Sequence, residues 1–213
     1  MLIGGAKGFA KEILEILRQS DKLDSVAFYD DINQDIGDYL FDRFPVLKSP
    51  EEAKAFFEKY GKEFTVGIGN PPNRYKLYRL FESLGGIFTS VISPYARIGG
   101  FGVEIGEGVN IMTYAVLTTD IHVGKGSLIN LAATVGHDVF MDEFVELAPA
   151  VNVSGKVSIG KFSFIGTGSV ILPGVKIGNN VTVGAGAVVS KDLPDNAVAV
   201  GVPAKIIKFK KPL

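Results

Sequence analysis

The chain has 213 residues, 46% of them hydrophobic, which is enough for one domain or two small ones with packed cores. Its 22 basic and 23 acidic side chains leave no overall field to attract nucleic acid or an anionic membrane, so we expect neither partner. The absence of cysteine excludes disulfides, cysteine-ligated zinc and a cysteine nucleophile, and the lack of a long apolar run or signal-like start predicts a cytoplasmic protein without membrane insertion.

Residues 1–90 show the pattern of alternating strands and helices. We predict strands at 2–3, 26–29, 65–68 and 88–92, and helices from about 9, from 50 to about 60 and from about 73 to 84. A capping box formed by Ser49 and Glu52 predicts the start of the helix at 50, with Pro50 as the first helical residue. This order predicts a small parallel sheet covered by helices, a Rossmann-like domain.

Three polar or glycine-rich clusters follow the strands of this domain, at the edge where such sheets bind ligands. They predict a nucleotide pocket built from Gly5, Lys7, Gly8, Asp30, Asp31, Gly69, Asn70 and Arg74. The glycine turn would offer backbone N–H groups to phosphate, and the aspartates would accept hydrogen bonds from ribose or base. Each cluster alone is also explained by an ordinary turn, a helix cap or a solvated helix residue, and the prediction depends on their convergence.

From residue 105 onward the sequence repeats every six residues. An aliphatic residue occupies every sixth position without exception: Ile105, Ile111, Leu117, Val123, Ile129, Val135, Met141, Leu147, Val153, Ile159, Ile165, Ile171, Ile177, Val183 and Val189. Four residues after each anchor from Ile105 to Val183 stands Val, Ala, Ile or Ser, on the same face of an extended chain. The repeat predicts a parallel β-helix with three hexads per coil. The seven-residue spacing from Ile98 to Ile105 predicts a bulge in the first coil.

Only two histidines are present, so a histidine base must be His122 or His137. His137 is followed by Asp138, a carboxylate that can fix the tautomer of the imidazole and stabilise the imidazolium. An exposed solenoid bend remains an alternative explanation for His137. For His122, which follows Ile121 beside a polar bend, a surface position is the favoured interpretation.

The whole chain resembles the bacterial sugar acyltransferases of the sialic acid O-acetyltransferase type, including N-acetyltransferases of nucleotide-linked 4-amino-4,6-dideoxy sugars. The resemblance is carried by the hexads, Gly4-Gly5-Ala6-Lys7-Gly8, Phe28-Tyr29-Asp30-Asp31, Ile68-Gly69-Asn70 with Arg74, Gly136-His137-Asp138 and Gly201-Val202-Pro203-Ala204-Lys205. It implies a left-handed coil, a homotrimer, and acetyl-CoA held in a groove between adjacent solenoids. It also implies a nucleotide-sugar-binding domain at 1–90, an acyltransferase domain at 91–200 and a tail at 201–213 that contributes to CoA binding.

By the same resemblance, His137 corresponds to the general base and Asp138 to its acidic partner, with no metal ion required. The positions implied for the cofactor are Asn130, Glu146, Gly155, Ala185, Pro203 and Lys205. Asn130 would lie near the acetyl group, and the backbone N–H of Gly155 would face the thioester. Glu146 stands where many relatives carry a second histidine, so either Glu146 replaces that polar contact or the cofactor geometry differs.

The resemblance therefore implies an acetyl-CoA-dependent N-acetyltransferase of a nucleotide-linked amino sugar in bacterial surface-glycan biosynthesis. O-acetylation of a sugar such as sialic acid needs the same base and cofactor and stays open, as does a non-catalytic scaffold or sugar-nucleotide sensor. A metalloenzyme similar to γ-class carbonic anhydrases is disfavoured, because two histidines cannot supply its three ligands. Serine acetyltransferases share the solenoid but usually have helical N-terminal parts.

Overall fold

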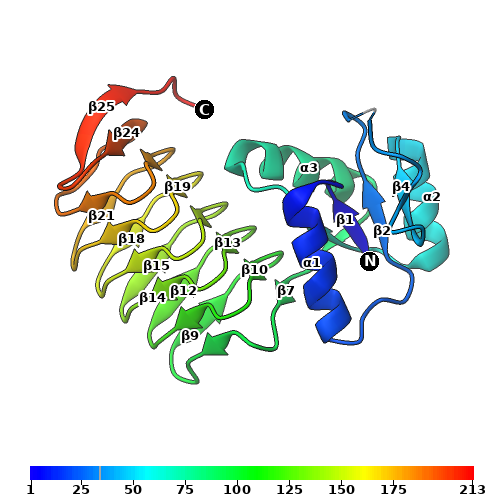
Figure 1. The fold of residues 1–213 in the computed structure, drawn as a ribbon, viewed down its shortest axis with the longest axis horizontal. Coiled ribbons are helices and arrows are strands. Elements are labelled where there is room, and N and C mark those ends of the chain that lie inside the picture. Colours follow the sequence, from blue (N-terminus) through cyan, green and yellow to red (C-terminus); the bar gives the residue numbers. More distant parts are fainter. Residues whose placement is uncertain (34) are drawn as a thin grey trace. The chain divides into compact units, whose positions relative to one another are not determined.

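The structure is a computed structural model that describes residues 1–33 and 35–213. The chain divides into two compact units, Met1–Val91 and Ile92–Leu213. The first is a small α/β domain, and the second is a solenoid of short strands (Figure 1).

The N-terminal unit is a parallel sheet with three helices. Its elements are β1 (Leu2–Gly4), α1 (Gly8–Gln19), β2 (Ala27–Tyr29), β3 (Tyr39–Leu40), β4 (Phe44–Leu47), α2 (Pro50–Tyr60), β5 (Glu63–Val66), α3 (Pro71–Ser83) and β6 (Ile87–Phe88). The strand order is β3-β4-β2-β1-β5-β6, and every pair is parallel except β3 with β4. The chain moves outward from β1 in both directions, which is the Rossmann-like pattern that the sequence predicts.

Two glycines show which helix covers which face of this sheet. A Cβ on Gly4 would meet the ring of Phe81 in α3 at 2.8 Å, whereas a Cβ on Gly67 would meet Ala10 of α1 at 2.6 Å and Ile3 of β1 at 3.1 Å. Ile3 and Gly4 are neighbours in β1, so their side-chain positions lie on opposite faces of the sheet. The helix α1 therefore covers the face of Ile3, and α3 covers the face of Gly4. The absence of side chains at these glycines lets both helices approach closely.

The hairpin of β3 and β4 is an element that the sequence analysis did not predict. Its strands are short, and Pro45 interrupts the second one, so neither shows a clear period of two. The helix α2 does begin as predicted: the Ser49 hydroxyl accepts a hydrogen bond from the Glu52 N–H at 3.3 Å. The Glu52 carboxylate accepts from the N–H of Lys48 at 2.7 Å, one residue earlier than in the standard capping box.

The solenoid consists of three sheets, parallel except for β25, that we number by their order along a coil. The first sheet contains β7 (Val91–Ile92), β10 (Asn110–Ile111), β13 (Leu128–Ile129), β16 (Glu146–Leu147), β19 (Phe164–Ile165), β22 (Thr182–Val183), β24 (Ala197–Val200) and β25 (Lys205–Phe209). The second contains β8 (Arg97–Ile98), β11 (Val116–Leu117), β14 (Thr134–Val135), β17 (Asn152–Val153), β20 (Val170–Ile171) and β23 (Val188–Val189). The third contains β9 (Val103–Ile105), β12 (Ile121–Val123), β15 (Val139–Met141), β18 (Ser158–Ile159) and β21 (Lys176–Ile177).

Strands of successive coils pair at a spacing of 18 residues, as Ile111 with Ile129 and Leu117 with Val135. All the aliphatic anchors from Ile111 to Val189 are buried in one core together with the Val, Ala, Ile and Leu residues four places after them. The serines at that place, Ser127, Ser163 and Ser169, are buried as well. The six-residue repeat therefore builds the parallel β-helix that it predicts (Figure 1).

The first and last coils depart from the regular repeat. Ile98 pairs with Leu117, 19 residues later, while Val103 pairs with Ile121 at the usual 18. The extra residue therefore lies in the turn 99–102 rather than in a bulged strand as predicted. At the other end, Thr182 pairs with Val198 only 16 residues later, and β25 then folds back antiparallel to β24.

Candidate active site

His137 lies in the turn that joins the second sheet to the third, directly after β14. Its Nδ1 lies 2.7 Å from Oδ2 of Asp138, and both side chains are more than half exposed. Asp138 has a positive φ of 58°, a conformation that Asp tolerates better than most residues. An Nδ1–H that donates to the carboxylate leaves the lone pair on Nε2, and no described residue hydrogen-bonds to that atom. The pair has the arrangement of a general base and its orienting acid.

Gly155 lies one coil after His137 and forms the surface on which the imidazole rests. A Cβ at this position would come within 2.6 Å of both Cε1 and Nε2 of His137. The coils are fixed by the hydrogen bond from the Lys156 N–H to the His137 carbonyl at 2.9 Å. The Gly155 N–H has no acceptor among the residues that the structure describes. The imidazole of His137 and the backbone N–H of Gly155 thus lie side by side.

The remaining predicted cofactor residues of the solenoid lie elsewhere on the coil. Asn130 and Ala185 occupy turns between the first and second sheets, at the opposite end of the second-sheet strands from His137. Asn130 is nearly buried, and its Oδ1 accepts from the Leu131 N–H at 2.7 Å. Glu146 is in β16 and only 5% exposed. Within one solenoid, therefore, these residues do not share a turn with His137 and Gly155.

The tail residues Pro203 and Lys205 are exposed at the end of the solenoid, where Lys205 begins β25. The tail is locally basic, with Lys208, Lys210 and Lys211 following. Lys210 donates to the Thr182 hydroxyl at 3.0 Å, and burial lowers the pKa of its ammonium group. The surrounding lysines provide positive charge suited to phosphate groups.

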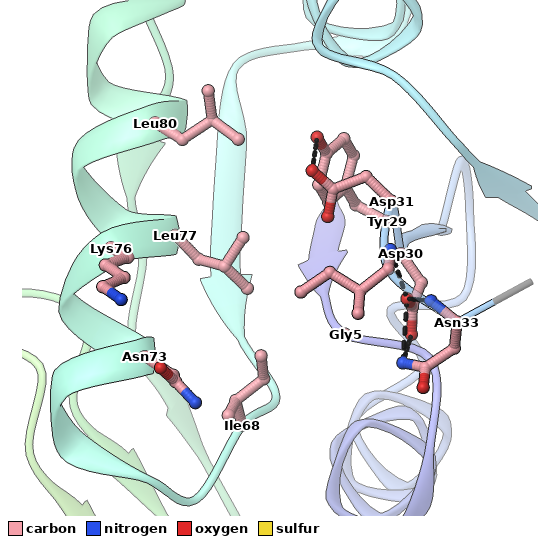
Figure 2. Close-up of a pocket in the computed structure, with 11 residues that line it drawn as sticks. Gly5, Tyr29, Asp30, Asp31, Asn33, Ile68, Asn73, Lys76, Leu77 and Leu80 are labelled. Atoms are coloured by element: carbon pink, nitrogen blue, oxygen red, sulfur yellow. Dashed lines mark hydrogen bonds between the residues drawn. The ribbon is translucent and has the colours of Figure 1, made fainter.

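A cavity of about 320 Å³ opens at the carboxyl ends of β1, β2 and β5 in the N-terminal domain (Figure 2). Of the predicted substrate residues it brings together Gly5, Asp30 and Asp31. Gly5 has a positive φ of 104°, and a Cβ there would press on the carbonyl of Gly67 at 3.1 Å, so glycine is required at the floor. The position of the cavity is the one that doubly wound sheets use for nucleotides.

The two aspartates have different roles in this cavity. Asp30 is nearly buried and its Oδ1 accepts from the backbone of Ile32 and Asn33, while the Asn33 amide donates to both of its oxygens (Figure 2). Asp31 is exposed and accepts one hydrogen bond, at 3.1 Å, from the Tyr29 hydroxyl. Burial, and then the hydrogen bond to Asp31, raise the pKa of the Tyr29 phenol above its usual range. Asp30 therefore shapes the turn, and Asp31 keeps acceptor capacity for a ligand.

The other predicted substrate residues do not line the cavity. Lys7 is the N-cap residue of α1 and pairs with Asp35 at 3.3 Å. Gly8 begins α1 with open space around it, and Asn70 caps α3 by accepting from the Asn73 N–H at 3.1 Å. Arg74 was expected to contact substrate, but it is only 1% exposed, and its Nη1 donates to the carbonyls of Ile68 and Gly69 at 3.2 and 2.6 Å. Arg74 thus holds the 68–70 turn in place.

The wall of the cavity that α3 forms was not predicted from the sequence. Asn73, Lys76, Leu77 and Leu80 line it across from Asp31 (Figure 2). Lys76 and Leu77 follow Asn73 by three and four residues, and Leu80 follows Leu77 by three, so the four residues lie on one helix face, a pattern already present in the sequence. Of the helix predicted from about 73 to 84, only Arg74 was expected to contact the substrate. Tyr29, Ile32, Asn33 and Ile68 complete the lining.

His122 has surface surroundings in the structure. Its Nδ1 lies 3.3 Å from the Glu104 carboxylate, and its ring stacks on Phe140 with centroids 4.9 Å apart. No group of three or more His, Asp or Glu side chains in the described part of the chain could hold a metal ion. None of the helices within residues 1–33 and 35–213 is long and apolar enough to cross a bilayer.

Comparison with known proteins finds relatives for both units. Residues 1–81 match the PglD N-terminal domain, and residues 156–191 match the bacterial transferase hexapeptide (six repeats). The galactoside O-acetyltransferase of Lactococcus lactis is 32% identical over 75% of this chain and 77% of its own length. The GDP-perosamine N-acetyltransferase of Escherichia coli O157:H7 is 30% identical over 81% of this chain and 78% of its own.

Solved structures resemble the whole chain. A mutant of perosamine N-acetyltransferase from Caulobacter crescentus, in complex with CoA and GDP-perosamine, has a TM-score of 0.90 and 34% identity, over 97% of this chain and 96% of that one. The acetyltransferase domain of PglB from Neisseria gonorrhoeae, in complex with acetyl coenzyme A, has a TM-score of 0.87 and 31% identity over 97% and 98%.

The β-helix is accordingly left-handed, as the resemblance implied. Three findings indicate the same family: the hexads, the α/β domain ahead of them, and relatives that match most of their own length and most of this chain. The chain belongs to the sugar acyltransferases of the hexapeptide-repeat superfamily, which are acetyl-CoA-dependent enzymes, and carries an N-terminal domain of the PglD type.

Proposed function

We propose that the protein transfers the acetyl group of acetyl-CoA directly to the amine of a nucleotide-linked 4-amino-4,6-dideoxy sugar, with His137 as general base. The observation that carries the proposal is the imidazole itself. Its Nδ1 lies 2.7 Å from the Asp138 carboxylate, and its Nε2 lies over Gly155. The backbone N–H of Gly155 donates no hydrogen bond to any described residue. The similar structures that contain CoA together with GDP-perosamine favour an amino sugar as acceptor.

The chemistry follows from these groups. Nε2 of His137 takes a proton from the sugar amine as its nitrogen attacks the thioester carbonyl carbon. The C–N bond forms, the carbonyl electrons move to the oxygen, and the Gly155 N–H stabilises that negative charge. When the C–S bond breaks, the CoA sulfur leaves with the electron pair and receives the proton from the imidazolium, which Asp138 stabilises until then.

We further propose that residues 1–90 bind the nucleotide sugar in the cavity that Asp31 lines, that residues 91–200 perform the transfer, and that the basic tail 201–213 contacts the phosphates of CoA. Asn130, Glu146, Ala185, Pro203 and Lys205 would complete the cofactor site. Because Asn130 and Ala185 lie at a different corner from His137, a site containing all three needs a second copy of the chain. This supports a homotrimer with sites between neighbours. A cytoplasmic role in surface-glycan biosynthesis fits such a substrate.

Sugar O-acetylation is a second candidate, favoured by the relative named as a galactoside O-acetyltransferase. The two functions differ in the acceptor alone. Acetyl-CoA offered with GDP-perosamine, with UDP-, dTDP- and CMP-linked sugars and with a galactoside would separate them, with mass spectrometry to locate the added acetyl group on nitrogen or oxygen. A non-catalytic scaffold would acetylate none of them and would not bind acetyl-CoA in a calorimetric titration.

The replacement His137→Ala tests the mechanism. It should lower kcat by at least about 10², because a positioned base contributes about 10² to 10⁴ in rate, while CoA affinity stays close to that of the wild type. The control is His122→Ala, which removes the other histidine from the outer surface of the third sheet and should retain full activity. Activity within a few-fold of wild type in His137→Ala would remove His137 from the mechanism.

A further inference from the structure

An exposed phenylalanine stands in the same column of turn residues as His137. We call this column the base corner; it comprises Phe101, Thr119, His137, Gly155 and Pro173 in the turns from the second sheet to the third. Its stacking is fixed by backbone hydrogen bonds from Asp120 to the Phe101 carbonyl at 3.1 Å and from Asp138 to the Thr119 carbonyl at 3.3 Å. Phe101 therefore lies two coils before His137, about 10 Å along the solenoid axis.

The backbone that carries Phe101 is held firmly, although its side chain is 80% exposed. The Gly99 N–H donates to the Leu117 carbonyl, and the Ile121 N–H donates to the Gly102 carbonyl, both at 2.9 Å. A Cβ on Gly99 would come within 1.6 Å of the Thr118 carbonyl oxygen, so this turn is seated directly on the next coil. Single exposed apolar residues are common on protein surfaces. Phe101 differs from such residues because its backbone is fixed in the column of the proposed base, in the turn that contains the extra residue of the first coil.

The acyl donor and the acceptor must approach His137 from different sides. The imidazole leans on Gly155, toward the later coils. Of the proposed cofactor positions, Asn130 belongs to the same coil as His137, and Glu146, Gly155, Ala185, Pro203 and Lys205 all follow His137 along the solenoid. The donor thus occupies the side of the later coils. The acceptor is therefore left with the side of His137 that faces the earlier coils. On that side the next residues of the base corner are Thr119 and then Phe101.

We propose that Phe101 forms the wall of the acceptor subsite and packs against the apolar face of the sugar ring whose amine is acetylated. The inference rests on the proposed function and names a specificity residue for it. The interval of two coils between Phe101 and His137 leaves room for one sugar ring with its amine toward Nε2. Burying the C–H face of the sugar against the aromatic ring removes apolar surface from water and fixes the orientation of the amine.

Steady-state kinetics of the full-length protein with acetyl-CoA and GDP-perosamine test this. Phe101→Ala should raise KM for GDP-perosamine by about 3- to 10-fold, the usual worth of one aromatic contact, and leave KM for acetyl-CoA unchanged. Phe101→Tyr keeps the ring and should restore the wild-type KM. The matched control is Phe140→Ala, which removes an exposed ring from the flat outer surface of the third sheet and should change neither KM.

The outcomes separate this inference from the proposed function. An active wild type whose Phe101→Ala variant keeps its KM for GDP-perosamine overturns the role of Phe101 alone. Equal increases of both KM values also overturn it, since they would indicate a general disturbance of the coil. A wild type that neither acetylates nor binds any nucleotide sugar overturns the proposed function and this subsite with it.

Discussion

At the scale of single residues, Gly155 is notable because its missing side chain decides where the imidazole lies. Replacement by alanine keeps the backbone N–H but puts a methyl group 2.6 Å from Nε2 of His137. The ring must then tilt or shift, and a displacement of about 1 Å can cost about 10² in rate. We expect Gly155→Ala to lose activity nearly as severely as His137→Ala while the fold and the affinity for CoA persist.

The control for this substitution is Gly37→Ala, because a Cβ at Gly37 meets no atom within 4 Å. Its kcat should equal that of the wild type. A Gly155→Ala enzyme with wild-type kcat would mean that the imidazole does not depend on this surface for its position.

The sequence identified polar residues near the two sites, but not whether each would bond to a ligand or to the protein's own backbone. His137 with Asp138 is an adjacent pair, and its geometry follows from one turn. Arg74 and Asp30 were expected to face a ligand, yet their hydrogen bonds go to the backbone of nearby turns, because a buried polar group must find a partner wherever the tertiary fold offers one. No local pattern distinguishes those two outcomes.

At the scale of elements, the start of α2 is determined by residues that are adjacent in the sequence. The Ser49 hydroxyl satisfies the N–H of Glu52, an otherwise orphaned donor of the first turn. We expect Ser49→Ala to lower the free energy of unfolding by about 1 kcal/mol and Ser49→Asp to restore it. Urea denaturation followed by circular dichroism measures the change.

Ser83→Ala serves as the comparison, because this exposed serine lies at the end of α3 and its hydroxyl bonds only to the Leu80 carbonyl. Its effect should stay within about 0.5 kcal/mol. If both alanine variants unfold at the same urea concentration, the cap adds no measurable stability.

Helices with clear caps and strands with a strict hydrophobic period could be predicted from the sequence. The elements that were not predicted have neither feature. The solenoid was the easiest case, since each hexad repeats the same burial pattern and the core confirms it. The hairpin of β3 and β4 has only two and four residues per strand, so its pairing depends on β2 beside it rather than on its own sequence. The cavity face of α3 was not predicted because a helix that borders a ligand carries apolar residues that face the ligand as well as apolar residues that face the core.

At the scale of the whole molecule, the separation of His137 from Asn130 on the coil makes the assembly testable through function. We expect His137→Ala and Asn130→Ala each to be inactive alone. Coexpressed in equal amounts, they should recover about a quarter of wild-type activity, because a randomly mixed trimer with shared sites regenerates that fraction of intact sites. Sedimentation should show three times the mass of one chain.

The mixture has an internal control, since two different tags allow mixed and unmixed assemblies to be separated before the assay. Activity should be found only in the mixed fraction. No recovery in mixed assemblies of the expected mass would show that each chain builds its site from its own residues.

The reversal of β25 has a consequence for the solution behaviour of the enzyme. The last parallel strand of a coil exposes unpaired backbone groups on which a further chain could add, and repeated addition produces filaments. Here β25 runs antiparallel along β24 and carries Lys205 and Lys208, charges that discourage another strand from docking. We expect the same short segment that we propose for phosphate recognition also to prevent this growth and to keep the enzyme a discrete particle at high concentration.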